Sequence, residues 1–114
     1  MAPEAYGQET WAIASGAQRS AAINVMGFER GSFQVPTAIT AGNFQVEVSN
    51  DGTTFSAVRA DDNTVVAAVA FVASTVFNLH PNVFKARWAR LFSSVAQGAA
   101  RSFTVQLSGP AGAA

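Results

Sequence analysis

The chain has 114 residues, with seven basic and seven acidic side chains, a formal net charge of zero and no cysteine. This length suits one domain with its own core, and the lack of a basic excess argues against electrostatic binding of nucleic acid. Without cysteine there is no disulfide framework, thiolate nucleophile or cysteine-ligated metal. Because 12% of the residues are charged and 49% are hydrophobic, copies repel one another weakly, and we expect the protein to work within an assembly.

The N-terminal segment 1–18 is rich in Ala, Gly and Gln with scattered large apolar side chains, and it predicts a flexible arm. It has no basic region followed by an apolar one, so it is not a secretory signal, and we expect synthesis in the cytoplasm. Exposed aromatic side chains dock into neighbouring subunits or stack on sugars. We therefore predict a partner-binding role for Tyr6, Trp11 and Ile13, with packing of Trp11 against its own domain as the alternative.

Strand patterns dominate the rest of the chain. In residues 43–49, Phe44, Val46 and Val48 alternate with polar residues, which predicts a strand with one buried and one exposed face. The same period of two recurs in other segments and is weakest in residues 20–26. The segments that we predict as strands on this basis are 20–26, 43–49, 53–58 and 101–107.

Two apolar segments are ambiguous. Residues 64–72 (TVVAAVAFV) are apolar on all sides, so periodicity does not separate a buried strand from a short helix, but the valines and the short length favour a strand. The segment is also too short for a membrane-spanning helix. In residues 85–92 (KARWARLF) the alternation breaks, since Trp88 and Arg90 share a parity that Leu91 does not. We favour a β-bulge here over an Arg90 that faces the core and pairs with a carboxylate.

Turn residues separate these strands. Asn50-Asp51-Gly52 predicts a hairpin, and Pro81 is placed to begin a single helical turn. Short strands at intervals of about 8–12 residues, punctuated by Gly, Pro and Asn, are typical of all-β sandwiches. We therefore predict an antiparallel, jelly-roll-like β-sandwich over residues 19–108, between the flexible arm 1–18 and a C-terminal tail 109–114.

Residues that could carry catalysis or bind a metal are few. His80 is the only histidine, and no nucleophile or carboxylate can be assigned to it, so we expect a turn or surface histidine. Asp51, Asp61 and Asp62 could bind a cation, but their loops lie at opposite ends of a predicted strand, which favours ordinary turns. The chain also lacks the glycine-rich motifs of nucleotide-binding proteins and hydrolases. We expect no enzymatic activity, no metal and no cofactor.

Two motifs resemble a known architecture. Residues 44–58 (FQVEVSNDGTTFSAV) resemble the strand–turn–strand of galactose-binding-like, discoidin-type jelly rolls, where a strand ends in Ser-x-Asp-Gly and an aromatic residue follows; here Phe55 takes that place. Residues 84–93 (FKARWARLFS) are similar to the Ala-Arg-aromatic-x-Arg-Leu strand of the same families. The run 20–108 also resembles small bacteriophage virion proteins. With short loops and no cysteine, the chain departs from the sugar- and lipid-binding members, so no family binding residue is transferred.

The resemblance implies a β-sandwich carried on a phage particle, as a head decoration (cement) protein or a tail or neck accessory. We expect a non-enzymatic virion structural protein, made in the cytoplasm of the host bacterium, that binds the major capsid protein or neighbouring virion subunits and stabilises the capsid. Repeated copies imply a homo-oligomer, such as a trimer. The alternative is a carbohydrate-binding or receptor-binding module of a phage tail, neck or spike, with a glycan as its partner. Neither hypothesis involves nucleic acid or a membrane.

Overall fold

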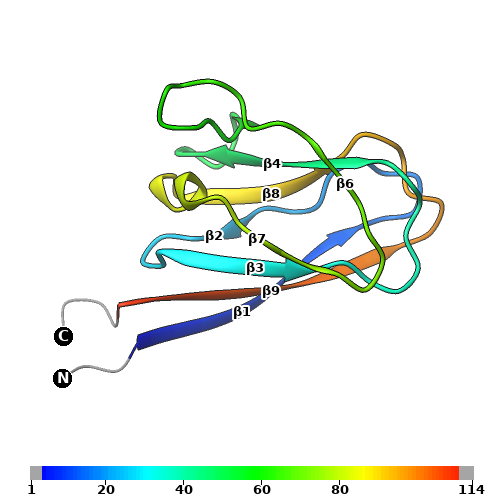
Figure 1. Cartoon of the computed structure of the whole chain (residues 1–114), viewed down its shortest axis with the longest axis horizontal. Coiled ribbons are helices and arrows are strands. Elements are labelled where there is room, and N and C mark those ends of the chain that lie inside the picture. Colours follow the sequence, from blue (N-terminus) through cyan, green and yellow to red (C-terminus); the bar gives the residue numbers. More distant parts are fainter. Residues whose placement is uncertain (1–3, 111–114) are drawn as a thin grey trace.

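Two antiparallel sheets face each other in the computed structural model, which describes residues 4–110 (Figure 1). The prediction of an antiparallel β-sandwich is therefore confirmed. A 3-10 helix, η1 (Pro81–Lys85), precedes β8. The first sheet has the order β1 (Glu4–Ile13), β9 (Arg101–Pro110), β3 (Arg30–Gln34) and β7 (Val76–Asn78). The second has the order β2 (Ile23–Asn24), β8 (Trp88–Ser93), β4 (Asn43–Ser49) and β5 (Ser56–Ala57), and β6 (Val69–Ala70) also pairs with β4.

Aromatic side chains fill the space between the sheets. The ring of Phe33 on β3 lies 5.6 Å from Trp11, 5.1 Å from Phe44, 5.8 Å from Phe77 and 6.3 Å from Phe103, measured between ring centroids. Three of these contacts are tilted or edge-to-face and one is stacked, at distances typical of favourable aromatic pairs. Phe33 therefore joins rings from both sheets into one core.

The predicted N-terminal arm is wrong for most of its length, because residues 4–13 form strand β1. This strand pairs with β9 over ten residues, from Glu4 opposite Pro110 to Ile13 opposite Arg101. Trp11 and Ile13 are fully buried, and the indole N–H of Trp11 donates a hydrogen bond to the carbonyl oxygen of Ala89 on the second sheet, at 3.2 Å. β1 is thus an integral edge strand of the sandwich.

A glycine hides the apolar alternation of β1 in the sequence. Gly7 is on the same face of the strand as Trp11 and Ile13, and the ring of Phe28 fills the space beside it. A Cβ at this position would lie 2.8 Å from Cζ of Phe28, closer than van der Waals contact permits. The apolar group that packs at this position is the ring of Phe28, which comes from another part of the chain. The sequence of β1 therefore lacks an apolar residue where an alternating strand would have one, and its composition suggests a tail.

The predicted domain boundaries at residues 18 and 108 are also wrong. The turn that follows β1 is attached to the domain, since the backbone N–H of Gly16 donates to the carbonyl of Gln97 at 2.7 Å and that of Gln97 donates to Ala17 at 3.0 Å. At the other end, β9 continues through Gly109 to Pro110. The remaining parts of the predicted tails, residues 1–3 and 111–114, lie outside the described residues.

Strand β8 contains no bulge, which corrects the prediction for residues 85–92. Its register with β4 is continuous, from Ser93 opposite Phe44 to Trp88 opposite Ser49. Burial alternates along the strand, and Arg90 lies on the outer face, where its Nε is 2.8 Å from Oε1 of Glu47. The alternative placed Arg90 on the core-facing side and paired it with a carboxylate. The ion pair forms, but on the outer face of the sheet.

The other predicted strands vary in accuracy. Residues 43–49 are confirmed as β4, and residues 101–107 lie within the longer β9. In the predicted strands 20–26 and 53–58, only the two-residue segments β2 and β5 form ladders. The predicted helical turn is confirmed as η1, in which Nδ1 of His80 accepts a hydrogen bond from the backbone N–H of Asn82 at 3.1 Å.

If β1 belongs to the core, replacing Trp11 must destabilise the whole domain. Trp11→Ala removes the largest fully buried side chain and its hydrogen bond to the opposite sheet, so we expect a loss of about 3–5 kcal/mol in the free energy of unfolding, measured by urea titration. Thr10→Ala, at an exposed position of the same strand, serves as the control and should change it by less than about 0.5 kcal/mol. Equal stability of the two variants would restore the flexible-arm hypothesis.

Candidate functional site

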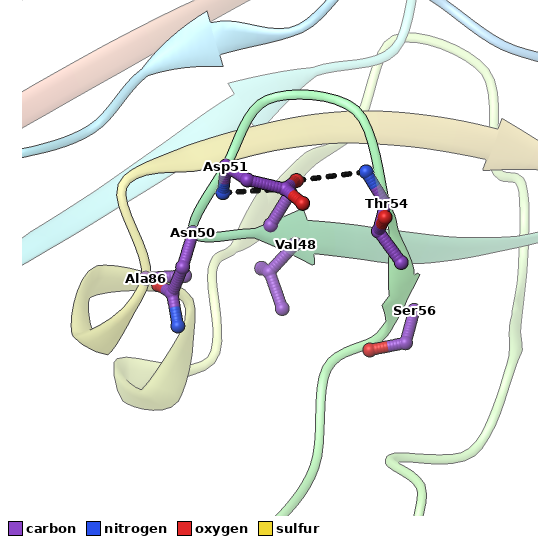
Figure 2. A pocket seen from close by; sticks show the side chains of 7 residues that line it. Val48, Asn50, Asp51, Thr54, Ser56 and Ala86 are labelled. Carbon is purple, nitrogen blue, oxygen red and sulfur yellow. Dashed lines mark hydrogen bonds between the residues drawn. The ribbon is translucent and has the colours of Figure 1, made fainter.

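The loop at Asp51 is a closed hairpin turn. β4 and β5 pair on either side of it, with Glu47 opposite Ala57 and Val48 opposite Ser56, so the predicted hairpin is confirmed. Oδ1 of Asp51 accepts hydrogen bonds from the backbone N–H groups of Thr54 at 2.8 Å and Thr53 at 2.9 Å, and from Oγ of Ser49 at 2.8 Å. These bonds hold Oδ1 of Asp51 within its own turn, and Figure 2 shows the bond from Thr54 beside a hollow of about 310 Å³.

Glycine and charge both stabilise this turn. Gly52 has a φ of +78°, in the left-handed region that glycine adopts without strain. The hydrogen bonds from the Thr54 and Thr53 amides and from the Ser49 hydroxyl hold the pKa of Asp51 well below its ordinary range. A carboxylate that stabilises its own loop in this way has a structural role, and we do not assign Asp51 to a binding site.

The other candidate polar residues also serve turns. Asp62 accepts hydrogen bonds from the N–H and Oγ of Thr64, at 3.0 and 2.6 Å, and Asp61 accepts one from Nδ2 of Asn82 at 2.8 Å. His80 caps η1 through its Nδ1 atom, as expected of a turn histidine. Within residues 4–110, no three His, Cys, Asp or Glu side chains gather where they could hold a metal ion, and no helix in that range is long and apolar enough to cross a membrane.

A charged cluster lies on the outer face of the second sheet. Oε1 of Glu47 accepts from Nε of Arg90 at 2.8 Å and from Nε of Arg19 at 3.1 Å. Each guanidinium also stacks on an aromatic ring, Arg90 on Phe55 at 3.9 Å and Arg19 on Phe92 at 4.5 Å. The aromatic residue that the resemblance singled out, Phe55, thus holds the hairpin loop against β8.

The three predicted partner-binding residues have different positions. Tyr6 is 75% exposed, while Trp11 and Ile13 are both 0% exposed. A side chain buried in its own core cannot anchor a partner, so the docking hypothesis is wrong for Trp11 and Ile13. For Trp11, the alternative of packing within its own domain is correct.

Exposed valines replace the predicted buried strand at residues 64–72. Val65, Val69, Val72 and Val76 are 46%, 43%, 53% and 56% exposed, and we call these four residues the valine strip. Of the predicted segment, Val69 and Ala70 form a strand, β6, and pair with Phe44 and Asn43 on β4. No Lys, Arg, Asp or Glu occurs in the chain between Asp62 and Lys85. The prediction of a buried strand is wrong because this segment runs along the outside of the sandwich.

Two phenylalanines attach this segment to the core. Phe71 lies 5.3 Å from the ring of Phe44 and 5.7 Å from that of Phe103, and Phe77 lies 4.9 Å from Phe44. Since β6 pairs with the second sheet and β7 with the first, the segment crosses from one sheet to the other (Figure 1). The two aromatic side chains thus pack against core rings, while Val72 and Val76 are more than half exposed. Val69 lies opposite the core residue Phe44 in the ladder.

An apolar cavity lies beside the valine strip. It has a volume of about 350 Å³, and its lining includes Phe33 and Phe77 from the core and Val66 and Val69 from the crossing segment. Large side chains that enter such pockets are the usual anchors of protein–protein interfaces. The strip and this cavity together form the strongest candidate for an interaction surface on the described part of the chain.

The whole fold is similar to that of a solved structure. The crystal structure of the SPBc2 prophage-derived protein YomS superposes with a TM-score of 0.69 and 8% sequence identity, over 95% of this chain and 96% of that one. The likeness shows that the two chains share a fold. No protein-family model and no curated protein sequence matches the chain.

Stability should depend on pH through Asp51. Its pKa is lowered by folding, so its carboxylate contributes stability above the ordinary aspartate range near pH 4 and loses it as the pH falls further. Asp51→Ala should therefore lower the unfolding temperature at pH 7, and the difference from the wild type should shrink toward pH 2. Asp51→Asn keeps an oxygen acceptor and is the control for charge. A difference that stays constant from pH 7 to pH 2 would show that the charge contributes nothing.

Proposed function

We propose that this chain is a non-enzymatic structural protein of a bacteriophage or phage-like particle, which binds the assembled capsid in repeated copies and stabilises it. The observation that carries the proposal is the valine strip, four valines each more than two fifths exposed within a stretch that contains no Lys, Arg, Asp or Glu. Exposed apolar surface of this kind marks sites that another protein covers. The partner is the major capsid protein or a neighbouring subunit of the virion.

The proposed docking surface is the valine strip, in place of Trp11 and Ile13. Trp11 and Ile13 are buried, so we propose that Val65, Val72 and their neighbours make the contacts with the partner that the sequence assigned to the segment 1–18. Covering a half-exposed valine contributes about 1 kcal/mol, and repetition over many copies on a particle multiplies small contributions. β7 forms the edge of the first sheet beside the strip, so backbone pairing with a partner strand is available there too.

The fold supports a phage-related role. YomS, which matches along nearly the whole chain, is described as prophage-derived, and the run 20–108 resembles small bacteriophage virion proteins. The zero net charge gives the free protein little self-repulsion, which suits a subunit that assembles. Asp51, Asp61 and His80 are engaged in turns, which agrees with a role that needs no catalytic group.

The proposal predicts that the protein is present in particles and that charges in the valine strip remove it. Val72→Lys combined with Val76→Lys places two charges at positions that are more than half exposed, where the fold tolerates them but an apolar interface does not. In particles purified from a strain that carries this double variant, we expect at least a tenfold drop in copies per particle, measured by quantitative mass spectrometry.

Thr10→Lys is the matched control, because it adds a charge at an exposed position of the other edge strand of the same sheet. It should be incorporated like the wild type, and thermal unfolding should show that all variants fold. Absence of the wild-type protein from particles would refute the proposed function. Normal incorporation of the double variant would refute the role of the valine strip alone.

A further inference from the structure

The outer face of the first sheet presents an ordered array of polar side chains. Strand register places Ser32 of β3 beside Asn78 of β7 on one side and beside Gln106 of β9 on the other. One step along the sheet, Ser108 lies between Arg30 and Tyr6. In both rows a serine, with its short side chain, separates longer side chains.

This arrangement forms a hollow of about 550 Å³, within the range of about 300–1,000 Å³ that holds small ligands. Its lining contains the six polar residues of the two rows, together with Gly31, Leu79 and Leu107. Tyr6 is 75% exposed and thus offers much of its ring to a ligand. Nε2 of Gln106 donates to Oε1 of Gln8 at 3.1 Å, which orients that amide.

The chemistry of the hollow suits a ligand with many hydroxyl groups. The amides of Asn78 and Gln106 each carry donors and an acceptor, and so can bind pairs of adjacent hydroxyls. The hydroxyls of Ser32 and Ser108 can donate or accept hydrogen bonds. An exposed tyrosine ring supplies the apolar surface on which the C–H face of a sugar ring packs. None of the six polar lining residues is an acid.

We propose that this hollow is a carbohydrate-binding site, in which Tyr6 packs against a sugar ring and Asn78, Gln106 and Arg30 bind its hydroxyl groups. A purely apolar ligand would cover these polar groups without hydrogen-bonding to them. A nucleic acid would need several cations, and Arg30 is the one cation among the described residues of the lining. The site goes beyond the proposed virion role and does not depend on it. Its hollow shares Asn78 and Leu79 with the apolar cavity beside the valine strip, and Val65 and Val72 are not in its lining.

The first test is direct binding by the purified, full-length chain. An array of immobilised oligosaccharides that covers neutral hexoses, N-acetylhexosamines and uronic acids should retain it above background. The soluble form of the best-retained oligosaccharide should then shift backbone amide NMR signals on β1, β3 and β9 around the hollow. Retention of no oligosaccharide, or shifts confined to the loops or to the second sheet, would refute the proposal.

Variants separate ring packing from hydrogen bonding. Tyr6→Ala should weaken affinity for the same oligosaccharide about tenfold, while Tyr6→Phe, which keeps the ring, should lose much less. Asn78→Ala should also weaken binding, and Thr10→Ala, on the same face two residues beyond Gln8, should leave it unchanged. Unchanged affinity in both Tyr6→Ala and Asn78→Ala would refute the site.

Failure of this proposal can be distinguished from failure of the virion role. Tyr6→Ala should enter particles at the wild-type level, because its position is outside the valine strip. The single variant Val72→Lys should bind the oligosaccharide like the wild type; Val76 is kept in this test because it lies on the same face of β7 as Asn78. A single variant that abolished both properties would show that the two surfaces are not separate, and would refute the assignment of distinct sites.

Discussion

The cluster of aromatic rings around Phe33 is the constraint on which the rest of the structure depends. Its ring contacts Trp11, Phe77 and Phe103 of the first sheet and Phe44 of the second, and these four residues come from four different strands. Because large rings pack well only in a few relative orientations, these contacts determine how the sheets face each other. The Trp11 N–H bonded to the Ala89 carbonyl adds a direct link between them. β1 and the crossing segment are held in place by the same cluster.

The candidate interaction surface is a consequence of that core. Phe71 and Phe77 pack against Phe44 in the core, while Val72 between them and Val76 beside them are more than half exposed. More than half of Val72 and of Val76 is exposed, and this is the surface that we propose a partner covers.

Polar and charged groups in this protein are used mainly for local geometry. Asp51 closes its hairpin, Asp62 its own turn, and His80 caps η1. Glu47 joins Arg19 and Arg90 on an outer face, where partial exposure limits the contribution of each ion pair. The two surfaces that we propose for recognition differ in character: one is an apolar strip at the edge of the sandwich, and the other is a polar hollow on the first sheet.

The sequence by itself determined the β-sandwich class, the strands β4 and β9, the hairpin at Gly52 and the helical turn at Pro81, because period-two patterning and turn residues are local properties. Only the tertiary structure decided that β1 is a strand, since the group that covers Gly7 is Phe28, and that β8 runs without a bulge, since Arg90 meets Glu47 across the sheet. It also decided that the valines are exposed and that Tyr6 borders a hollow. These features depend on which residues meet across strands, and strand register is set by contacts between distant parts of the chain.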